Sequence, residues 1–171
     1  MKISKHNFFS IIWTALRIWL GYQWISAGWE KITGGGWVGA TSGVGITGFL
    51  KGAVAKAGGA HPAVQSWYGN FIKNVALPNA KVFSYLVAYG EILVGISLIL
   101  GALTVVGLIA GAFMNLNYLL AGTTSTNPNL YTVAIILLFV GANAYTFGLD
   151  RFIVPILKNK FCNKSNSNLV I

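Results

Sequence analysis

Four long runs of apolar residues dominate the chain, and they cover residues 8–29, 83–100, 105–121 and 131–149. Each has about the 17 to 25 residues that an α-helix needs to cross a hydrocarbon core ~30 Å thick. A helix satisfies its own backbone hydrogen bonds in lipid, and the runs lack the short alternating pattern of a membrane β-barrel. The pattern therefore predicts an all-α membrane protein, a four-transmembrane-helix bundle that forms a single domain over residues 1–171.

A long insert, residues 30–82, separates the first predicted span from the second. It begins with the glycine-rich stretch GGGWVGATSGVG and continues with two stretches of partial helical periodicity. Neither stretch is apolar enough to cross a membrane. We therefore expect short helices that lie on the membrane face, with Trp37, Trp67 and Tyr68 at headgroup depth.

The distribution of positive charge predicts the orientation of the spans. An even number of spans places both chain ends on one side, and these ends carry Lys2, Lys5, Arg151, Lys158, Lys160 and Lys164. Basic residues close to the spans favour the cytoplasmic side. The sequence thus predicts a multi-pass protein of the cell membrane with both termini cytoplasmic, a cytoplasmic tail over 150–171 and an extracytoplasmic insert.

Composition supports a membrane environment and argues against several kinds of function. Hydrophobic residues make up 55% of the chain and charged residues only 9%, against about 25% charged in a soluble domain. The net charge of +9 has no nucleic-acid-reading module beside it, so we expect no nucleic-acid partner. A single cysteine, Cys162, forms neither an internal disulfide nor a C-x-x-C motif. Two histidines and three acidic residues supply few ligands, so no metal site is predicted.

Two ionisable residues interrupt the apolar runs near their midpoints. Arg17 is the tenth residue of the first run, and Glu91 is the ninth of the second. Because an isolated charge in a bilayer is costly, and because antiparallel spans would place both at similar depth, we expect an Arg17–Glu91 ion pair. The pair would either fix the register of two helices or line a polar pocket for a ligand head group or a proton relay. The residues alone leave both readings open.

Four further side chains extend this polar region. Trp24 lies on the same stripe of the first span as Arg17, and Asn115, Asn117 and Tyr118 lie in the third span. Indole, phenol and amide groups beside an arginine could hold a flat ring with carbonyl oxygens, such as a quinone. Each group also has a simpler role, since Asn115 can hydrogen-bond between helices and Trp24 can belong to an aromatic belt.

Three other residues carry weaker signals. Gly107 and Gly111 are one helical turn apart, a spacing that lets another helix pack closely and that also leaves room for a homo-oligomer. His61 precedes Pro62 in the insert and is either a proton carrier at the membrane face or a solvated loop residue.

Three motifs occur in order along the chain. They are LRIWLGYQWISAGWEKI with its internal arginine, YGEILVGISLILGALTVVGLIAGAFMNLNYLLAG with its Gly-Glu pair and tight hairpin, and FGLDRFI after the fourth run. Together they resemble the DoxX/DoxD family of small four-helix membrane proteins. The resemblance implies both ends in the cytoplasm and a redox role at the quinone pool. Family members include the membrane subunit of a thiosulfate:quinone oxidoreductase, which has a second subunit, and proteins linked to complexes that handle thiols and oxidative stress.

The leading hypothesis is a membrane subunit of a quinone-linked oxidoreductase complex, with quinone as a non-covalent cofactor and a second subunit as partner. Arg17 would hold a quinone oxygen or an oxyanion, Glu91 would orient Arg17 and exchange protons, and Asn115 would donate a hydrogen bond. Electrons would pass to the quinone, either directly from a bound substrate or from a partner subunit that carries a cofactor. The alternative is a non-catalytic scaffold or assembly protein, or a small carrier for an anionic or lipid-like solute. The sequence leaves open whether the chain is an enzyme.

Overall fold

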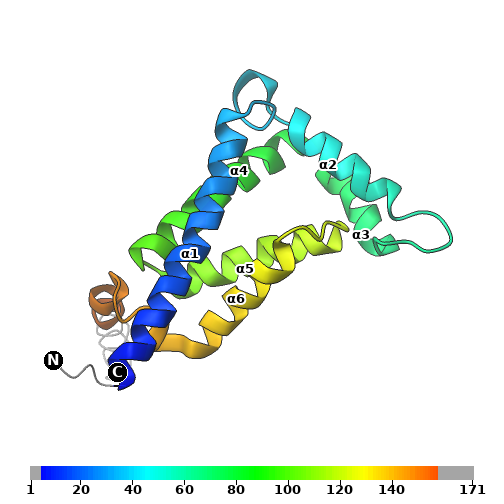
Figure 1. Cartoon of the computed structure of the whole chain (residues 1–171). Helices are drawn as coiled ribbons and strands as arrows, with labels where there is room; N and C mark the ends of the chain where they lie inside the picture. The colour runs from blue at the N-terminus through cyan, green and yellow to red at the C-terminus, as the bar shows by residue number, and fades with distance from the viewer. Residues whose placement is uncertain (1–4, 158–171) are drawn as a thin grey trace, which may run out of the picture.

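The structure is a computed structural model that describes residues 5–157, and over this range it contains helices and no strands (Figure 1). Four long helices form the body of the molecule: α1 (Lys5–Thr33), α4 (Ala80–Leu100), α5 (Thr104–Leu120) and α6 (Asn127–Val140). Short elements join them: η1 (Gly39–Thr41), α2 (Val44–Ala55), α3 (Ser66–Phe71), the π-helical turn η2 (Ile72–Ala76) and η3 (Gly141–Ala144). A last helical segment covers residues 150–157. The expected all-α class is confirmed for the described part of the chain.

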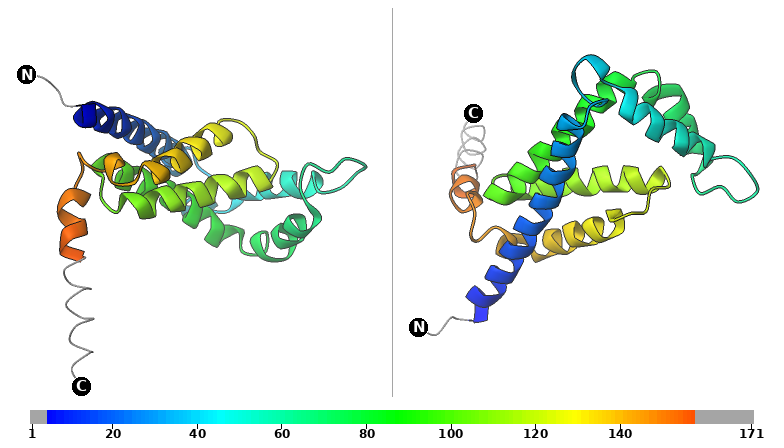
Figure 2. Two further views of the ribbon diagram at one scale, coloured as in Figure 1. Left: turned by 90° about the horizontal axis from the view of Figure 1, so that it is seen from below. Right: turned by 45° about the horizontal axis from the view of Figure 1, so that its top comes forward.

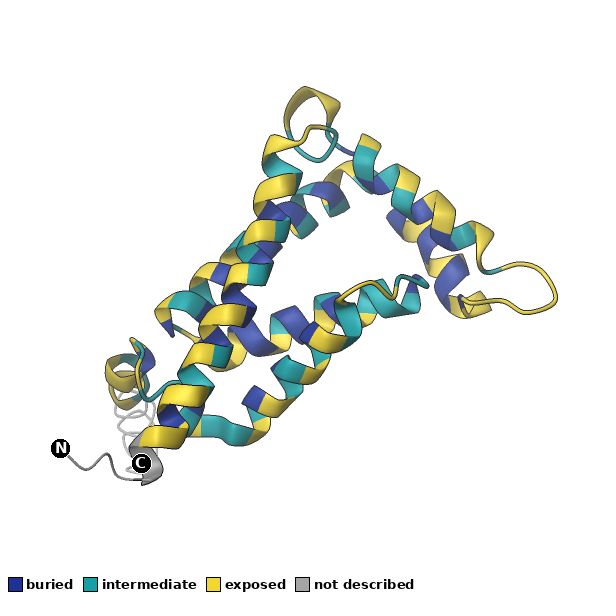
Figure 3. Ribbon diagram, viewed as in Figure 1, coloured by how far each residue is buried: buried dark blue, intermediate teal, exposed yellow. Residues whose placement is uncertain are grey.

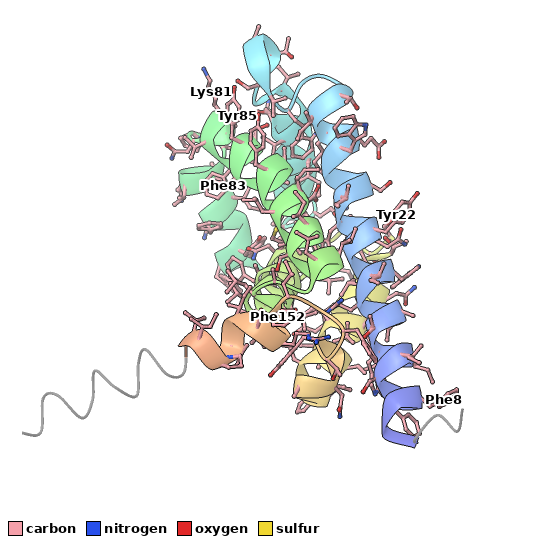
Figure 4. All side chains as sticks on the ribbon, turned by 90° about the vertical axis from the view of Figure 1, so that its left-hand side faces the viewer. Phe8, Tyr22, Lys81, Phe83, Tyr85 and Phe152 are labelled. Carbon is pink, nitrogen blue, oxygen red and sulfur yellow. The ribbon has the colours of Figure 1, made fainter. Side chains whose placement is uncertain are left out.

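Two of the described helices are long and apolar enough to cross a membrane, Ala80–Leu100 and Asn127–Ala144, and Thr104–Leu120 is apolar but shorter. The large apolar residues on their outer faces are exposed (Figure 3), including Leu93 at 66% and Phe139 at 89%. On α1, Phe8 and Tyr22 point away from the other helices (Figure 4). Extended exposed apolar faces of this kind need lipid or a partner to cover them, which indicates a membrane protein.

α1 and α4 pack against each other in antiparallel directions, and glycines set the register. A Cβ at Gly21 would lie 2.9 Å from the carbonyl oxygen of Gly95, and one at Gly28 would lie 3.0 Å from that of Ala88. Only glycine lets the two backbones come this close, as small residues do in membrane helix pairs. The start of α4 therefore lies beside the end of α1.

The insert folds back over one end of the bundle. α2, α3 and η2 share a small core that includes Ile46, Leu50, Val64, Tyr68 and Ile72. Figure 2 shows α2 and α3 together at the end of the molecule opposite the first turns of α1. The segment over 150–157 lies at the same end as those first turns (Figures 1 and 2).

Two boundaries differ from those expected from the sequence. The first helix continues to Thr33 and α4 begins at Ala80, so the insert is shorter than residues 30–82. The last apolar run, 131–149, is not one continuous α-helix. α6 begins earlier than the run, with a proline in its first turn, and ends at Val140, before Gly141. Gly141 has a φ of 61° and a ψ of −127°, a backbone conformation that glycine adopts at low cost and that interrupts the α-helix.

Candidate functional site

A cavity of about 710 Å³ lies between α1, α4, α5 and the helices of the insert. Its volume falls within the range of small-molecule sites. Most of its walls are apolar, and it is rich in aromatic rings: Trp24, Trp37, Phe49, Tyr68, Phe71, Phe83, Phe113 and Tyr118. A few polar side chains converge on it, which is the usual composition of a site for an amphipathic ligand.

The strongest polar feature of the wall is an ion pair between α1 and α4. Lys31 Nζ lies 2.8 Å from Glu91 Oε2 and 3.0 Å from Oε1. The Tyr118 hydroxyl of α5 donates to Glu91 Oε1 at 2.7 Å. Glu91 is 2% exposed, whereas Lys31 is 20% exposed and also lies over the Trp37 ring, 5.2 Å from its centroid. Three helices thus meet at one carboxylate, which is linked through Lys31 to the surface.

The expected Arg17–Glu91 pair is wrong. The register of α1 against α4 places Gly28 beside Glu91, so the residue one turn further along α1, Lys31, reaches the carboxylate. Arg17 instead lies against Gly101, ten residues from Glu91 along α4, or about 15 Å at the helical rise per residue. Counting from the ends of the apolar runs could not give this register, because α1 extends past its apolar run.

Arg17 belongs to a second polar cluster at the opposite end of the bundle. Its Nη2 donates to the Phe147 carbonyl at 3.0 Å, and it is attracted to the carboxylate of Asp150. Asp150 accepts hydrogen bonds from the backbone N–H groups of Leu103 and Thr104, each at 2.7 Å. The carboxylate therefore caps the N-terminus of α5 from a distant part of the chain. Arg17 does not line the cavity.

Two buried side chains of the cavity wall have polar atoms without a hydrogen-bond partner among the described residues. They are Nε1 of Trp24 and both amide atoms of Asn115, in residues that are 2% and 0% exposed. A Cβ at Gly111, one turn before Asn115 on α5, would lie 3.1 Å from Trp24 Nε1. The two unsatisfied groups thus face the same part of the interior. Unpaired buried donors and acceptors are costly, so a ligand that supplied hydrogen-bond partners to these groups would be favoured here.

Asn117 and Tyr68 connect the insert to α5. The Tyr68 hydroxyl lies 2.9 Å from Asn117 Oδ1 and 3.1 Å from its carbonyl oxygen. Burial raises the pKa of the Tyr68 phenol, so it remains a donor at neutral pH. Tyr68 and Lys31 were not among the candidates that the sequence suggested. The only local signal for Lys31 was its position one turn beyond Gly28, in the first of the three motifs.

The remaining candidates lie outside the cavity. His61 is exposed in the loop between α2 and α3. Gly107 faces α4, where a Cβ would lie 2.5 Å from Ser97 Oγ, and Gly111 faces Trp24 and Val94. Both glycines therefore contact neighbouring helices of the same chain. Among residues 5–157, no three His, Cys, Asp or Glu side chains come together as a metal site would require.

The chain was compared with known protein families, curated proteins and solved structures. Residues 12–124 match a protein family described as DoxX, and this range includes most of α1, the insert, α4 and α5. No curated protein and no solved structure matches the chain.

Proposed function

Because the chain belongs to the DoxX family, we propose that it is the membrane subunit of a quinone-linked oxidoreductase complex and that the cavity holds the quinone head group. In this proposal α1, α4, α5 and α6 cross the cell membrane as a four-helix bundle in one domain. Both chain ends lie in the cytoplasm, and the insert lies on the outer side. The first turns of α1 and residues 150–157 lie at the same end of the molecule in Figure 2, which supports placing both chain ends on one side of the membrane.

The observation that carries the proposal is the pair of unsatisfied groups on Trp24 and Asn115. An indole N–H and an amide N–H are both donors, and a quinone ring has two carbonyl oxygens that accept hydrogen bonds. The aromatic wall would pack on the faces of such a ring. Tyr118 and Phe49, whose own rings meet edge to face at 6.0 Å, would lie on the insert side of the ligand. Because Trp24 is 2% and Asn115 0% exposed, their side chains would move to bring these donors to the ring.

Glu91 is the acidic side chain of the cavity wall. We assign it the exchange of protons with the ligand through the Tyr118 hydroxyl, with Lys31 as the connection to the insert face. Lys31 offsets the cost of a buried carboxylate and holds it in one position. Arg17 has no part in this site, and its role in the proposal is to hold the far end of the bundle together.

A bound quinone would supply two-electron redox chemistry in the membrane. The electrons would come from a second subunit that oxidises thiosulfate or a thiol compound, and that subunit would dock on the exposed faces of this chain. The chain's own residues would bind and orient the ring, exclude water and hold the proton at Glu91.

A second candidate function is a small carrier for a lipid-like solute. One observation favours it: the cavity wall has exposed polar residues, Ser125 and Thr126, in addition to exposed apolar ones. A carrier would take up its solute past the exposed residues of one kind and release it past those of the other kind. The Lys31–Glu91 pair would then hold the solute's head group.

The test is the quinone content of protein purified in mild detergent, measured by mass spectrometry of the extracted lipids. Trp24→Phe and Asn115→Leu keep the size of the side chain approximately and remove the donor, so both should lose bound quinone. The matched control is Trp19→Phe, because Trp19 is 41% exposed on the outer face of α1 and does not line the cavity. Equal quinone content in wild type and both cavity variants, or none in wild type, would contradict the proposal.

A further inference from the structure

Five exposed residues contribute to the cavity wall, and they mark two different openings. Three are apolar and come from three helices: Phe71 of α3 at 37%, Leu86 of α4 at 63% and Phe113 of α5 at 65% exposed. The other two, Ser125 and Thr126, are polar and belong to the loop between α5 and α6. The cavity therefore has an apolar mouth on the side of the helices and a polar mouth at the insert end.

The apolar mouth lies on a face of the molecule that remains apolar along both helices. Leu93, two turns after Leu86 on α4, is 66% exposed, and Ile109, one turn before Phe113 on α5, is 56% exposed. A face of this composition is suited to lipid rather than to water. The mouth would thus open into the hydrocarbon layer.

We infer that the ligand of this cavity is a membrane-dissolved molecule with an acceptor-bearing ring and a single long apolar chain, and that the chain leaves between α4 and α5, past Leu86 and Phe113. This inference rests on the proposed function of the cavity as a quinone site. The ring lies inside, at the buried donors of Trp24 and Asn115, and the chain connects that position to the lipid. A cavity of about 710 Å³ is larger than a substituted quinone ring needs and accommodates the first part of the chain as well.

The physical chemistry of the two mouths selects the route. An apolar chain that moves from lipid into an apolar mouth exchanges one hydrocarbon environment for another. The same chain directed past Ser125 and Thr126 would desolvate hydroxyl groups and meet water. In the wild-type protein the apolar chain of the ligand therefore changes the affinity of the ring little. When the apolar mouth is narrowed, that chain loses its route to the lipid, and the affinity of the chain-bearing ligand falls.

The experiment compares two probes in protein reconstituted into lipid nanodiscs. One is a dimethoxy-methyl-benzoquinone with a decyl chain, and the other is the same ring without the chain. Binding is measured by quenching of tryptophan fluorescence. The variant Leu86→Trp narrows the apolar mouth, and Leu93→Trp is the matched control, with the same substitution on the same helix at a position of similar exposure outside the cavity.

We expect wild type and Leu93→Trp to bind both probes. Leu86→Trp should bind the ring alone normally, which also shows that it is folded, and should bind the decyl probe about tenfold more weakly, the usual scale for overpacking. Equal binding of the two probes by Leu86→Trp would overturn the inference while leaving the proposed quinone site in place.

A photoreactive group at the end of the decyl chain gives a second readout. Labelling of α4 near Leu86 and of α5 near Phe113, competed by excess unlabelled probe, supports the route. Competed labelling of the Ser125–Thr126 loop overturns it. Failure of both probes to bind wild type would instead refute the proposed function, and the inference with it.

Discussion

Lys31 of α1 and Glu91 of α4 form an ion pair 2.8 Å long inside the wall of the cavity, at the point where α5 adds the Tyr118 hydroxyl. The pair is asymmetric, since the carboxylate is 2% exposed and the ammonium 20%. Removing Lys31 and removing Glu91 should therefore change the stability of the protein by different amounts.

Lys31→Met leaves a buried carboxylate without its counter-charge and should destabilise the protein by about 3–5 kcal/mol. Glu91→Gln should cost less, because the Lys31 ammonium already reaches solvent. The double variant Lys31→Met/Glu91→Leu should recover most of the loss. Unfolding in detergent micelles, followed by circular dichroism with increasing SDS, measures these differences. Wild-type stability of Lys31→Met would show that the pair is not formed in the membrane.

Arg17→Lys should lower stability without lowering quinone content. The substitution removes the planar guanidinium that donates to the Phe147 carbonyl, a hydrogen bond from a charged group whose loss costs about 1.5–3 kcal/mol. The cavity is not touched, because Arg17 does not line it. The measurements are unfolding in detergent and quinone extraction from the same preparation. Loss of quinone from a stably folded Arg17→Lys protein would return Arg17 to the binding site.

Asp150→Ala should destabilise the molecule by about 1–2 kcal/mol, the range for loss of a helix cap. Both carboxylate oxygens accept backbone N–H groups at the start of α5, and alanine satisfies neither. Asp150→Asn retains one acceptor oxygen and should have a smaller effect. Hydrogen exchange at the amides of Leu103 and Thr104 reports the loss directly, and unchanged protection there would contradict the capping role.

Gly21→Ala should separate α1 from α4, because the added Cβ would lie 2.9 Å from the Gly95 carbonyl oxygen. The expected loss is about 1–3 kcal/mol. Gly52 on α2 is the matched control, since it is exposed and a Cβ there meets nothing within 4 Å. Gly52→Ala should therefore stabilise α2 by up to ~1 kcal/mol. Thermal unfolding of both variants tests the contrast, which fails if Gly21→Ala is neutral.

The sequence predicts the helices well because long apolar runs have few alternatives in a chain of this composition. It also predicts five residues that share the cavity wall, because polar and aromatic groups inside apolar runs are rare; they are Trp24, Glu91, Asn115, Asn117 and Tyr118. The confirmed family membership follows from several motifs that occur in the same order along the chain.

The partner of Glu91 could not be predicted in the same way. It depends on how far α1 slides along α4, and that register is set by the close contacts of Gly21 and Gly28 rather than by the ends of the apolar runs. Tyr68 was missed for a different reason. Its bond to Asn117 joins residues 49 positions apart, and only the fold of the insert brings them together.

The cap on α5 also sets an order of events during synthesis. Thr104 and Asp150, which share a hydrogen bond, are 46 positions apart. When α4 and α5 have just been made, the N–H groups at the start of α5 have no carboxylate to accept their hydrogen bonds. That bond forms only after α6 and the segment that carries Asp150 have been made. The Leu-Asp-Arg segment thus closes the bundle last, and a ribosome that stalls before residue 150 leaves a chain whose third long helix is still open at one end.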